Sequence, residues 1–181
     1  MNPKKTLQQI FDINGEEALY ISSTGYLSRL AYQINKERSF KYTIFYMQGS
    51  MGLAPCIGLG VALCNRDVNV VVLNGDGAYL MQLGFDFLLD SYVIDDKVKV
   101  NHYVFVNNCY ESTGGQFFKD SCYSMLNGIA VTNTSFINVD KIEDSVERFF
   151  KMEVPDRVEI TPEENTKQVM EFLRRSEKWI N

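Results

Sequence analysis

The chain has 181 residues, which is long enough for one domain of ordinary size with a real hydrophobic core. Hydrophobic residues make up 45% and charged residues 23%, a balance typical of a globular protein and not of a disordered one. The net charge of −5 and the lack of a dense Lys/Arg stripe argue against nucleic-acid binding.

The sequence indicates neither a targeting segment nor a zinc motif. The N-terminal stretch MNPKKTLQQIFDINGEE lacks the apolar core and cleavage site of a secretory signal. The longest low-charge stretch, residues 47–65, carries glycines and a proline, which fits a buried helix better than a membrane span. No C-x-x-C pair is present, and the single histidine, His102, opens an apolar run and is expected to be structural. We expect a cytoplasmic protein with reduced thiols at Cys56, Cys64, Cys109 and Cys122.

Strand-like and helix-like segments alternate along the whole chain. Runs of branched apolar residues predict strands, and apolar residues spaced three or four apart predict helices. In chain order the sequence predicts a strand at 18–23, a helix at 26–37, a strand at 43–47, a helix at 53–64, a strand at 68–74, a helix at 78–89, a strand at 100–106, a short helix at 121–128, a strand at 135–139, a helix at 141–150, a strand at 157–160 and a last helix after Thr161. Such alternation predicts a single α/β domain over residues 1–181, with three layers and a parallel sheet between helices.

Two helices carry further local signals. The helix at 53–64 has small residues at Ala54, Gly58, Gly60 and Ala62, which predict close packing on the sheet because glycine is otherwise costly in a helix. In the last helix, Thr161 is placed to cap the N-terminus, with Pro162 at the first helical position and Glu164 three residues after the cap.

Glycine-rich segments follow four of the predicted strands. They read STG at 23–25, QGSMG at 48–52, NGDGA at 74–78 and NNCYESTGGQ at 107–116. Ligands of an open parallel sheet bind beyond the carboxyl ends of its strands, so these four segments mark the expected site. Glycines let the backbone approach a ligand closely, and free backbone amides attract phosphate.

Asp76 stands between two glycines at the end of the most apolar strand. A carboxylate there would repel phosphate unless a cation lay between them, and Asn107 and Asn108 offer neutral oxygens on the next loop. Mg²⁺ takes oxygen ligands, usually one or two carboxylates together with phosphate oxygens. A metal-diphosphate site is therefore coherent. Taken alone, NGDG is better explained as a tight strand-helix turn with Asp76 as a cap. Together with Asn107-Asn108 at the end of the next strand, the metal-diphosphate interpretation is favoured.

The combination of Gly75-Asp76-Gly77 with Asn107-Asn108 resembles the signature of the thiamine diphosphate enzymes. The nearer resemblance is to the phosphonopyruvate and sulfopyruvate decarboxylase group, in the half that binds the diphosphate. It extends over nearly the whole chain, through ISSTGYLSRLAYQI, FYMQGSMGLAPCIGLGVALC, VVVLNGDGAYLMQLG, ESTGGQ and ITPEENTKQVMEFLRR. From Asp76 to Asn108 the spacing is longer than usual, and we place the surplus in SYVIDDKVKVNH.

The resemblance implies thiamine diphosphate and Mg²⁺ as cofactors. It implies that Asp76 and Asn108 ligate the metal by their side chains and Tyr110 by its main-chain carbonyl. Met51 would be the apolar wedge that bends the cofactor, and the Gly49 carbonyl would accept from its amino group; core packing is the alternative role for Met51. The implied cofactor contacts are Thr24, Gly25, Gly49, Ser50, Met51, Gly75, Asp76, Gly77, Ala78, Asn108 and Tyr110.

In this family a glutamate from a separate pyrimidine-binding domain assists the cofactor, and the chain contains no second α/β unit to supply it. Glu111 lies on the diphosphate side and cannot take that role. The resemblance therefore implies one subunit of a hetero- or homo-oligomeric decarboxylase, active only with a pyrimidine-binding partner. Its substrate would be a small 2-oxo acid such as phosphonopyruvate or sulfopyruvate. A non-catalytic binding domain and a carboligase of the acetolactate synthase kind are the alternatives.

The identity of the 2-oxo acid cannot be read from the sequence. An anionic substrate needs basic groups, and the candidates are Arg29, Lys36, Arg38 and Lys119, which the sequence alone does not rank. A solvated or ion-paired role is the plainer expectation for Arg29.

Overall fold

The computed structural model describes residues 1–85, 88, 91–92, 98–117, 134–142 and 158–175. Their helices are α1 (Pro3–Asn14), α2 (Tyr26–Glu37), α3 (Ala54–Cys64), α4 (Asp76–Tyr79) and α7 (Pro162–Arg175), with short 3₁₀ helices η1 (Leu80–Gln82) and η2 (Glu111–Thr113). Their strands are β1 (Ala18–Ser22), β2 (Thr43–Tyr46), β3 (Asn69–Gly75), β4 (Val100–Val106), β5 (Cys109–Tyr110), β6 (Gln116–Phe117) and β7 (Thr134–Asn138).

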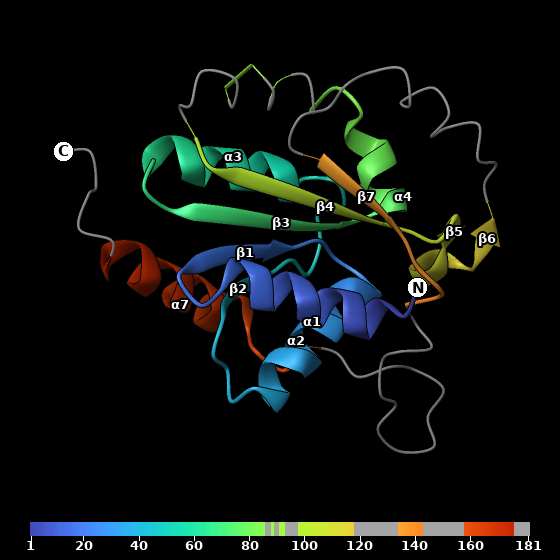
Figure 1. The fold of residues 1–181 in the computed structure, drawn as a ribbon, viewed down its shortest axis with the longest axis horizontal. Coiled ribbons are helices and arrows are strands. Elements are labelled where there is room, and N and C mark those ends of the chain that lie inside the picture. The colour runs from blue at the N-terminus through green and yellow to red at the C-terminus, as the bar shows by residue number, and fades with distance from the viewer. Residues whose placement is uncertain (86–87, 89–90, 93–97, 118–133, 143–157, 176–181) are drawn as a thin grey trace.

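Five strands form one parallel sheet in the order β2-β1-β3-β4-β7. Helices α1 and α2 lie on one side of this sheet and α3 on the other (Figure 1). β5 and β6 make a separate antiparallel pair just beyond the end of β4. The predicted α/β architecture, with a parallel sheet between two helical layers, is confirmed.

Side chains along the central strands point alternately to the two faces of the sheet, which explains why both faces are apolar. Tyr20, Val71 and Leu73 point into a core shared with α1 and α2, whereas Ile21 and Val72 point into a core shared with α3 and α7. Side chains two apart share a face of a strand, so a strand covered on both sides needs apolar residues at nearly every position. The run VNVVVLN meets this requirement.

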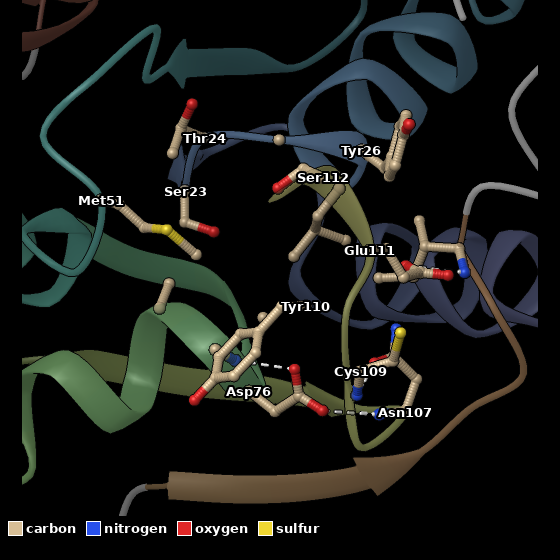
Figure 2. Close-up of a pocket in the computed structure, with 16 residues that line it drawn as sticks. Ser23, Thr24, Tyr26, Met51, Asp76, Asn107, Cys109, Tyr110, Glu111 and Ser112 are labelled. Atoms are coloured by element: carbon tan, nitrogen blue, oxygen red, sulfur yellow. Dashed lines mark hydrogen bonds between the residues drawn. The ribbon is translucent and has the colours of Figure 1, made fainter. Parts of the chain in front are cut away.

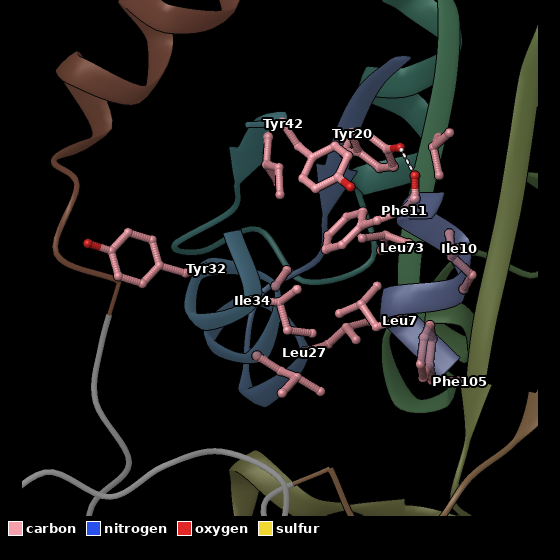
Figure 3. Close-up of a cluster of buried hydrophobic side chains, with 14 of the residues drawn as sticks. Leu7, Ile10, Phe11, Tyr20, Leu27, Tyr32, Ile34, Tyr42, Leu73 and Phe105 are labelled. Carbon is pink, nitrogen blue, oxygen red and sulfur yellow. Dashed lines mark hydrogen bonds between the residues drawn. The ribbon is translucent and has the colours of Figure 1, made fainter. Parts of the chain in front are cut away.

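The first core is built around aromatic rings (Figure 3). The ring of Phe11, on α1, stacks on Tyr42 with centroids 4.7 Å apart and meets the edge of Tyr20 at 4.9 Å. The Tyr20 hydroxyl donates to the carbonyl of Gly15 at 2.7 Å, so this buried polar group is satisfied. The sequence pattern did not predict α1, although Asn2 caps it by accepting from Lys5 N at 3.0 Å.

Two of the small residues in α3 behave differently. A Cβ added to Gly58 would lie 2.7 Å from Cγ2 of Val72, so the helix approaches β3 as closely as the sequence predicted. Gly60 is exposed, and an added Cβ there would meet no atom within 4 Å. The prediction of close packing is therefore correct for Gly58 and wrong for Gly60, which lies on the opposite side of the helix.

The start of α7 matches the predicted cap. Thr161 N donates to Glu164 Oε2 at 3.0 Å, and Glu164 N donates to Thr161 Oγ1 at 3.2 Å, which is a reciprocal capping box. Because these bonds satisfy otherwise orphaned amides, the helix begins at Pro162 as expected.

Several predicted boundaries need correction. Residues 158–160 form no strand; the segment is instead tied by side chains, with Glu159 accepting from Tyr32 at 2.9 Å. The helix predicted at 78–89 begins earlier, at Asp76, and changes to a 3₁₀ helix at Leu80. A turn follows at residues 83–84, where Gly84 disfavours a continuous α-helix. The helix predicted at 121–128 lies outside the described residues, as does the helix predicted at 141–150 except for residues 141 and 142. Within the segment 91–102, where the surplus was placed, residues 93–97 lie outside them as well.

Candidate functional site

The sheet order creates a switch point between β1 and β3. From β1 the chain moves outward through α2 to β2 and then returns through α3 to β3 on the other side of β1. Connections therefore leave the carboxyl ends of these two strands in opposite directions, which opens a crevice between them. Ser23 N donates to Leu73 O at 2.8 Å, which holds the STG turn beside the end of β3.

A pocket occupies this crevice (Figure 2). All four glycine-rich segments contribute to its walls, through the STG turn, Met51, the GDGA turn and the loop after β4. Its described lining consists of Ser23, Thr24, Gly25, Tyr26, Leu27, Met51, Gly75, Asp76, Gly77, Ala78, Asn107, Cys109, Tyr110, Glu111, Ser112 and Ile142. The convergence expected from the carboxyl ends of the strands is thus what the fold produces.

Asp76 is 3% exposed and joins the two motif segments (Figure 2). Its Oδ1 accepts from Gly77 N at 2.7 Å, and its Oδ2 accepts from the backbone amides of Asn107 at 2.8 Å and Asn108 at 2.7 Å. Burial raises the pKa of this carboxyl above its ordinary value, and the three amide donors act in the opposite direction. A buried carboxylate of this kind gains from a nearby cation.

Asn108, the second expected metal ligand, is not among the residues that line the pocket, but it carries a buried oxygen in the same motif as Asp76. Its backbone is left-handed, with φ of 58°, and its side-chain Oδ1 is buried without a hydrogen-bond partner. A buried acceptor without a donor costs free energy, so this oxygen suits a ligand atom for a metal. Asn107 differs, because its Oδ1 accepts from Cys109 N at 2.9 Å and shapes the turn.

The two oxygens suit a hard cation that takes its remaining ligands from phosphate. Within the described residues, no group of three His, Cys, Asp or Glu side chains could hold a metal alone. One carboxylate and one amide oxygen leave most positions of an octahedron to other oxygens, as is usual for Mg²⁺ bound to a diphosphate. The residues at this edge therefore fit the expected cofactor and metal.

Tyr110 is close to the motif, but its carbonyl is engaged. Tyr110 O accepts from Gly115 N at 3.0 Å and from Thr113 Oγ1 at 3.4 Å, both within its own loop. The ring instead covers Gly77, where an added Cβ would lie 2.7 Å from Tyr110 Cδ1. Metal ligation by this carbonyl stays a prediction, and the ring contact is a role that the sequence did not indicate.

The QGSMG turn presents one of its residues to the pocket. Ser50 and Gly52 have φ of 55° and 90°, and this tight turn directs Met51 toward the GDGA segment. The Met51 methyl lies 3.6 Å from the position of a Cβ built on Gly77. Gly49 and Ser50 are exposed and do not line this pocket, so their cofactor roles remain predictions.

The structure adds residues that motif reading passed over. Ser23 is 1% exposed, lines the pocket and has a hydroxyl without a partner. Glu111 Oε2 accepts from Ile142 N at 3.1 Å and so fastens the loop after β4 to the segment after β7. Ser112 Oγ would lie 3.2 Å from a Cβ at Gly25. All three lie within STG or ESTGGQ, so the motifs contained the signal.

Other features of the chain do not belong to the pocket. His102 is buried, with Nε2 3.3 Å from Asn74 Nδ2 and Nδ1 3.2 Å from Thr134 Oγ1, which confirms its structural role. Cys56 and Cys64 are exposed free thiols, and Cys122 lies outside the described residues. Among the described helices, none has the length and apolar character needed to cross a bilayer.

Comparison with known proteins agrees with the geometry. Residues 22–171 match the family model for the thiamine pyrophosphate enzyme, C-terminal TPP binding domain; thiamine pyrophosphate is another name for thiamine diphosphate. The match extends over most of the chain, so the chain belongs to this family of cofactor-binding domains.

Individual relatives narrow the resemblance. The sulfopyruvate decarboxylase beta subunit of Methanocaldococcus jannaschii is 38% identical over 122 residues, which cover 64% of this chain and 58% of that protein. The beta subunit from Methanothermobacter thermautotrophicus is 40% identical over 101 residues, 56% of this chain and 50% of that protein. A phosphonopyruvate decarboxylase of Streptomyces viridochromogenes is 39% identical over 100 residues, 55% of this chain and 23% of that protein. The chain thus spans about half the length of the beta subunits that it matches.

Proposed function

We propose that residues 1–181 form the diphosphate-binding domain of a thiamine pyrophosphate-dependent 2-oxo acid decarboxylase. The observation that carries this proposal is the buried Asp76 carboxylate at the switch point of the sheet, which accepts from the backbone amides of Asn107 and Asn108, together with the buried and partnerless side-chain oxygen of Asn108. Relatives named for sulfopyruvate and phosphonopyruvate decarboxylation supply the substrate class, a short 2-oxo acid with a second anionic group.

Each motif segment has a physical task in this proposal. Asp76 and Asn108 would hold Mg²⁺, and backbone amides at Ala78 and in the turn at Thr24 and Gly25 would face the diphosphate. The amide of Gly77, also an expected cofactor contact, instead donates to Asp76 Oδ1. Thiamine pyrophosphate, when bound, supplies the electron sink that a 2-oxo acid needs to lose its carboxylate. The chain itself fixes the position of the cofactor and, with the apolar side chain of Met51, limits the conformations that it can adopt.

A partner chain completes the proposed enzyme. Two of the relatives are named as beta subunits, and the described residues contain one α/β sheet. We propose that a separate pyrimidine-binding chain supplies the remaining catalytic groups in a hetero-oligomer. We also propose a cytoplasmic location, in which the free thiols of Cys56, Cys64 and Cys109 stay reduced.

Reconstitution tests this function. The chain is purified with the partner that co-purifies with it, then mixed with thiamine pyrophosphate, Mg²⁺ and sulfopyruvate, phosphonopyruvate or pyruvate. Release of CO₂ together with the corresponding aldehyde is the expected result. Formation of acetolactate from pyruvate would instead show that the enzyme is a carboligase. Tight cofactor binding by the chain, without turnover of any of these acids, would indicate a non-catalytic binding domain.

A further inference from the structure

A second, wider pocket opens beside the cofactor pocket. It has a volume of about 470 Å³, within the range of small-molecule sites. The two pockets share Thr24, Gly25, Met51 and Ser112, so they are continuous around the STG turn and the tip of Met51. A molecule that reacts at the cofactor has room to extend into this wider space.

Arg29 gives the wider pocket its charge. It is the one charged side chain among the described lining residues, and it is half-buried on the first turns of α2. Its guanidinium lies 5.2 Å from the centre of the Tyr26 ring, a contact that holds the planar group in place. The described lining of the pocket therefore carries one positioned cation.

The other described basic candidates do not line either pocket. Lys36 pairs with Glu159 at 3.1 Å, and Arg38 pairs with Asp12 at 2.5 Å, both away from the two pockets. Lys119 lies outside the described residues. Of the three described candidates, Arg29 alone lines the wider pocket, so the structure ranks what the sequence could not.

Neutral donors accompany the guanidinium. Ser28 is 2% exposed, lines the same pocket, and has a hydroxyl without a hydrogen-bond partner. Ser112 and Thr113 add hydroxyl groups from the loop after β5. A guanidinium with several hydroxyls is the donor set that binds a tetrahedral oxyanion well, because the planar fork of arginine meets two of its oxygens at once.

We propose that Arg29, with Ser28 beside it, binds the second anionic group of the substrate, a sulfonate or phosphonate attached next to the 2-oxo group. This inference rests on the proposed function and names the residue that would distinguish such substrates from pyruvate. The carboxylate that leaves as CO₂ would lie in the cofactor pocket, and the retained anion would extend into the wider pocket. Arg29 is thus a specificity residue and not part of the metal-diphosphate grip.

Substrate comparison tests the assignment on the reconstituted pair. Arg29→Gln should raise KM for sulfopyruvate or phosphonopyruvate by about 10- to 100-fold, the loss expected for a charge-assisted contact. KM for pyruvate, which lacks the second anion, should change less than about threefold, and Arg29→Lys should recover part of the loss. The acid with the larger change identifies the anion that the pocket is built for. Arg66→Gln, an exposed arginine beyond α3, is the matched control.

Two kinetic outcomes would overturn the assignment. An equal rise in KM for pyruvate and for the two larger acids would mean that Arg29 binds the common carboxylate or only supports the fold. An unchanged KM for all three acids would remove it from the substrate site. Should the wild-type pair turn over none of them, the proposed function fails separately. Calorimetry with sulfoacetate and phosphonoacetate, compared with acetate, still decides whether an Arg29-dependent anion site exists, and equal binding by Arg29→Gln would refute it.

Discussion

The backbone amide of Asn108, at the end of β4, donates to Asp76 Oδ2, at the end of β3, over 2.7 Å. This bond makes the two halves of the motif one unit, although 31 residues lie between them in the chain. Asn108 has a left-handed backbone at this point, and its buried Oδ1 has no hydrogen-bond partner. The carboxylate therefore has two tasks, as a candidate metal ligand and as the anchor of its neighbour.

Replacement of Asp76 tests the first task. Asp76→Ala should lower the Mg²⁺-dependent affinity for thiamine pyrophosphate by about 100-fold or more, because it removes both a ligand and the charge that attracts the cation. Calorimetry with and without Mg²⁺ measures this, with the exposed Asp67→Ala as control. An affinity within a few-fold of wild type would leave Asp76 as a turn residue only.

Asn108→Gly separates ligation from anchoring. Glycine tolerates the left-handed backbone and keeps the amide that donates to Asp76, so only the side-chain oxygen is lost. We expect weaker Mg²⁺-dependent cofactor binding with a melting temperature close to wild type. A fall in melting temperature without a change in affinity would show that the oxygen serves the fold.

A steric relationship between Gly77 and Tyr110 can be tested without any cofactor. Gly77→Ala places a Cβ 2.7 Å from the Tyr110 ring, and we expect a loss of about 1–3 kcal/mol in the free energy of unfolding. Because the clash needs the ring, the double variant with Tyr110→Ala should lose less than the sum of the single losses. Urea unfolding of the four proteins measures the coupling, and strictly additive losses would contradict the contact.

The sequence was most informative where chemistry was local. Branched runs located β1, β3 and β4, and the Thr161–Glu164 pair located the start of α7. The motif glycines located the pocket, because parallel strands bring their carboxyl ends to one edge. The helix α1 was missed although its signals are local, because Asn2 caps it and Leu7, Ile10 and Phe11 share one helical face. The contact of the Tyr110 ring with Gly77 could not be predicted, since it depends on residues distant in the chain.

Gly58 and Gly60 form a matched pair within one helix. Gly58→Ala should destabilise the protein by about 1–3 kcal/mol, since the new methyl would overlap Val72. Gly60→Ala is exposed and meets no neighbouring atom, so it should stabilise the protein by about 0.5–1 kcal/mol through helix propensity. Thermal or urea unfolding gives both values. Equal effects of the two substitutions would mean that α3 does not present Gly58 to β3.

Met51 provides the sharpest test of a catalytic role, because it borders both pockets and its methyl faces the GDGA turn. If it constrains the bound cofactor, Met51→Ala should lower kcat by about tenfold or more while cofactor affinity changes less than about threefold, since the grip at Asp76 is intact. Met51→Leu, which keeps most of the volume, should recover most of the rate. Met170→Ala is the control: this methionine packs against the α3 side of the sheet, so its loss should lower the melting temperature and leave kcat unchanged. Steady-state kinetics, calorimetry and thermal unfolding on the same four proteins separate the two roles, and a Met51→Ala effect confined to the melting temperature would assign Met51 to packing.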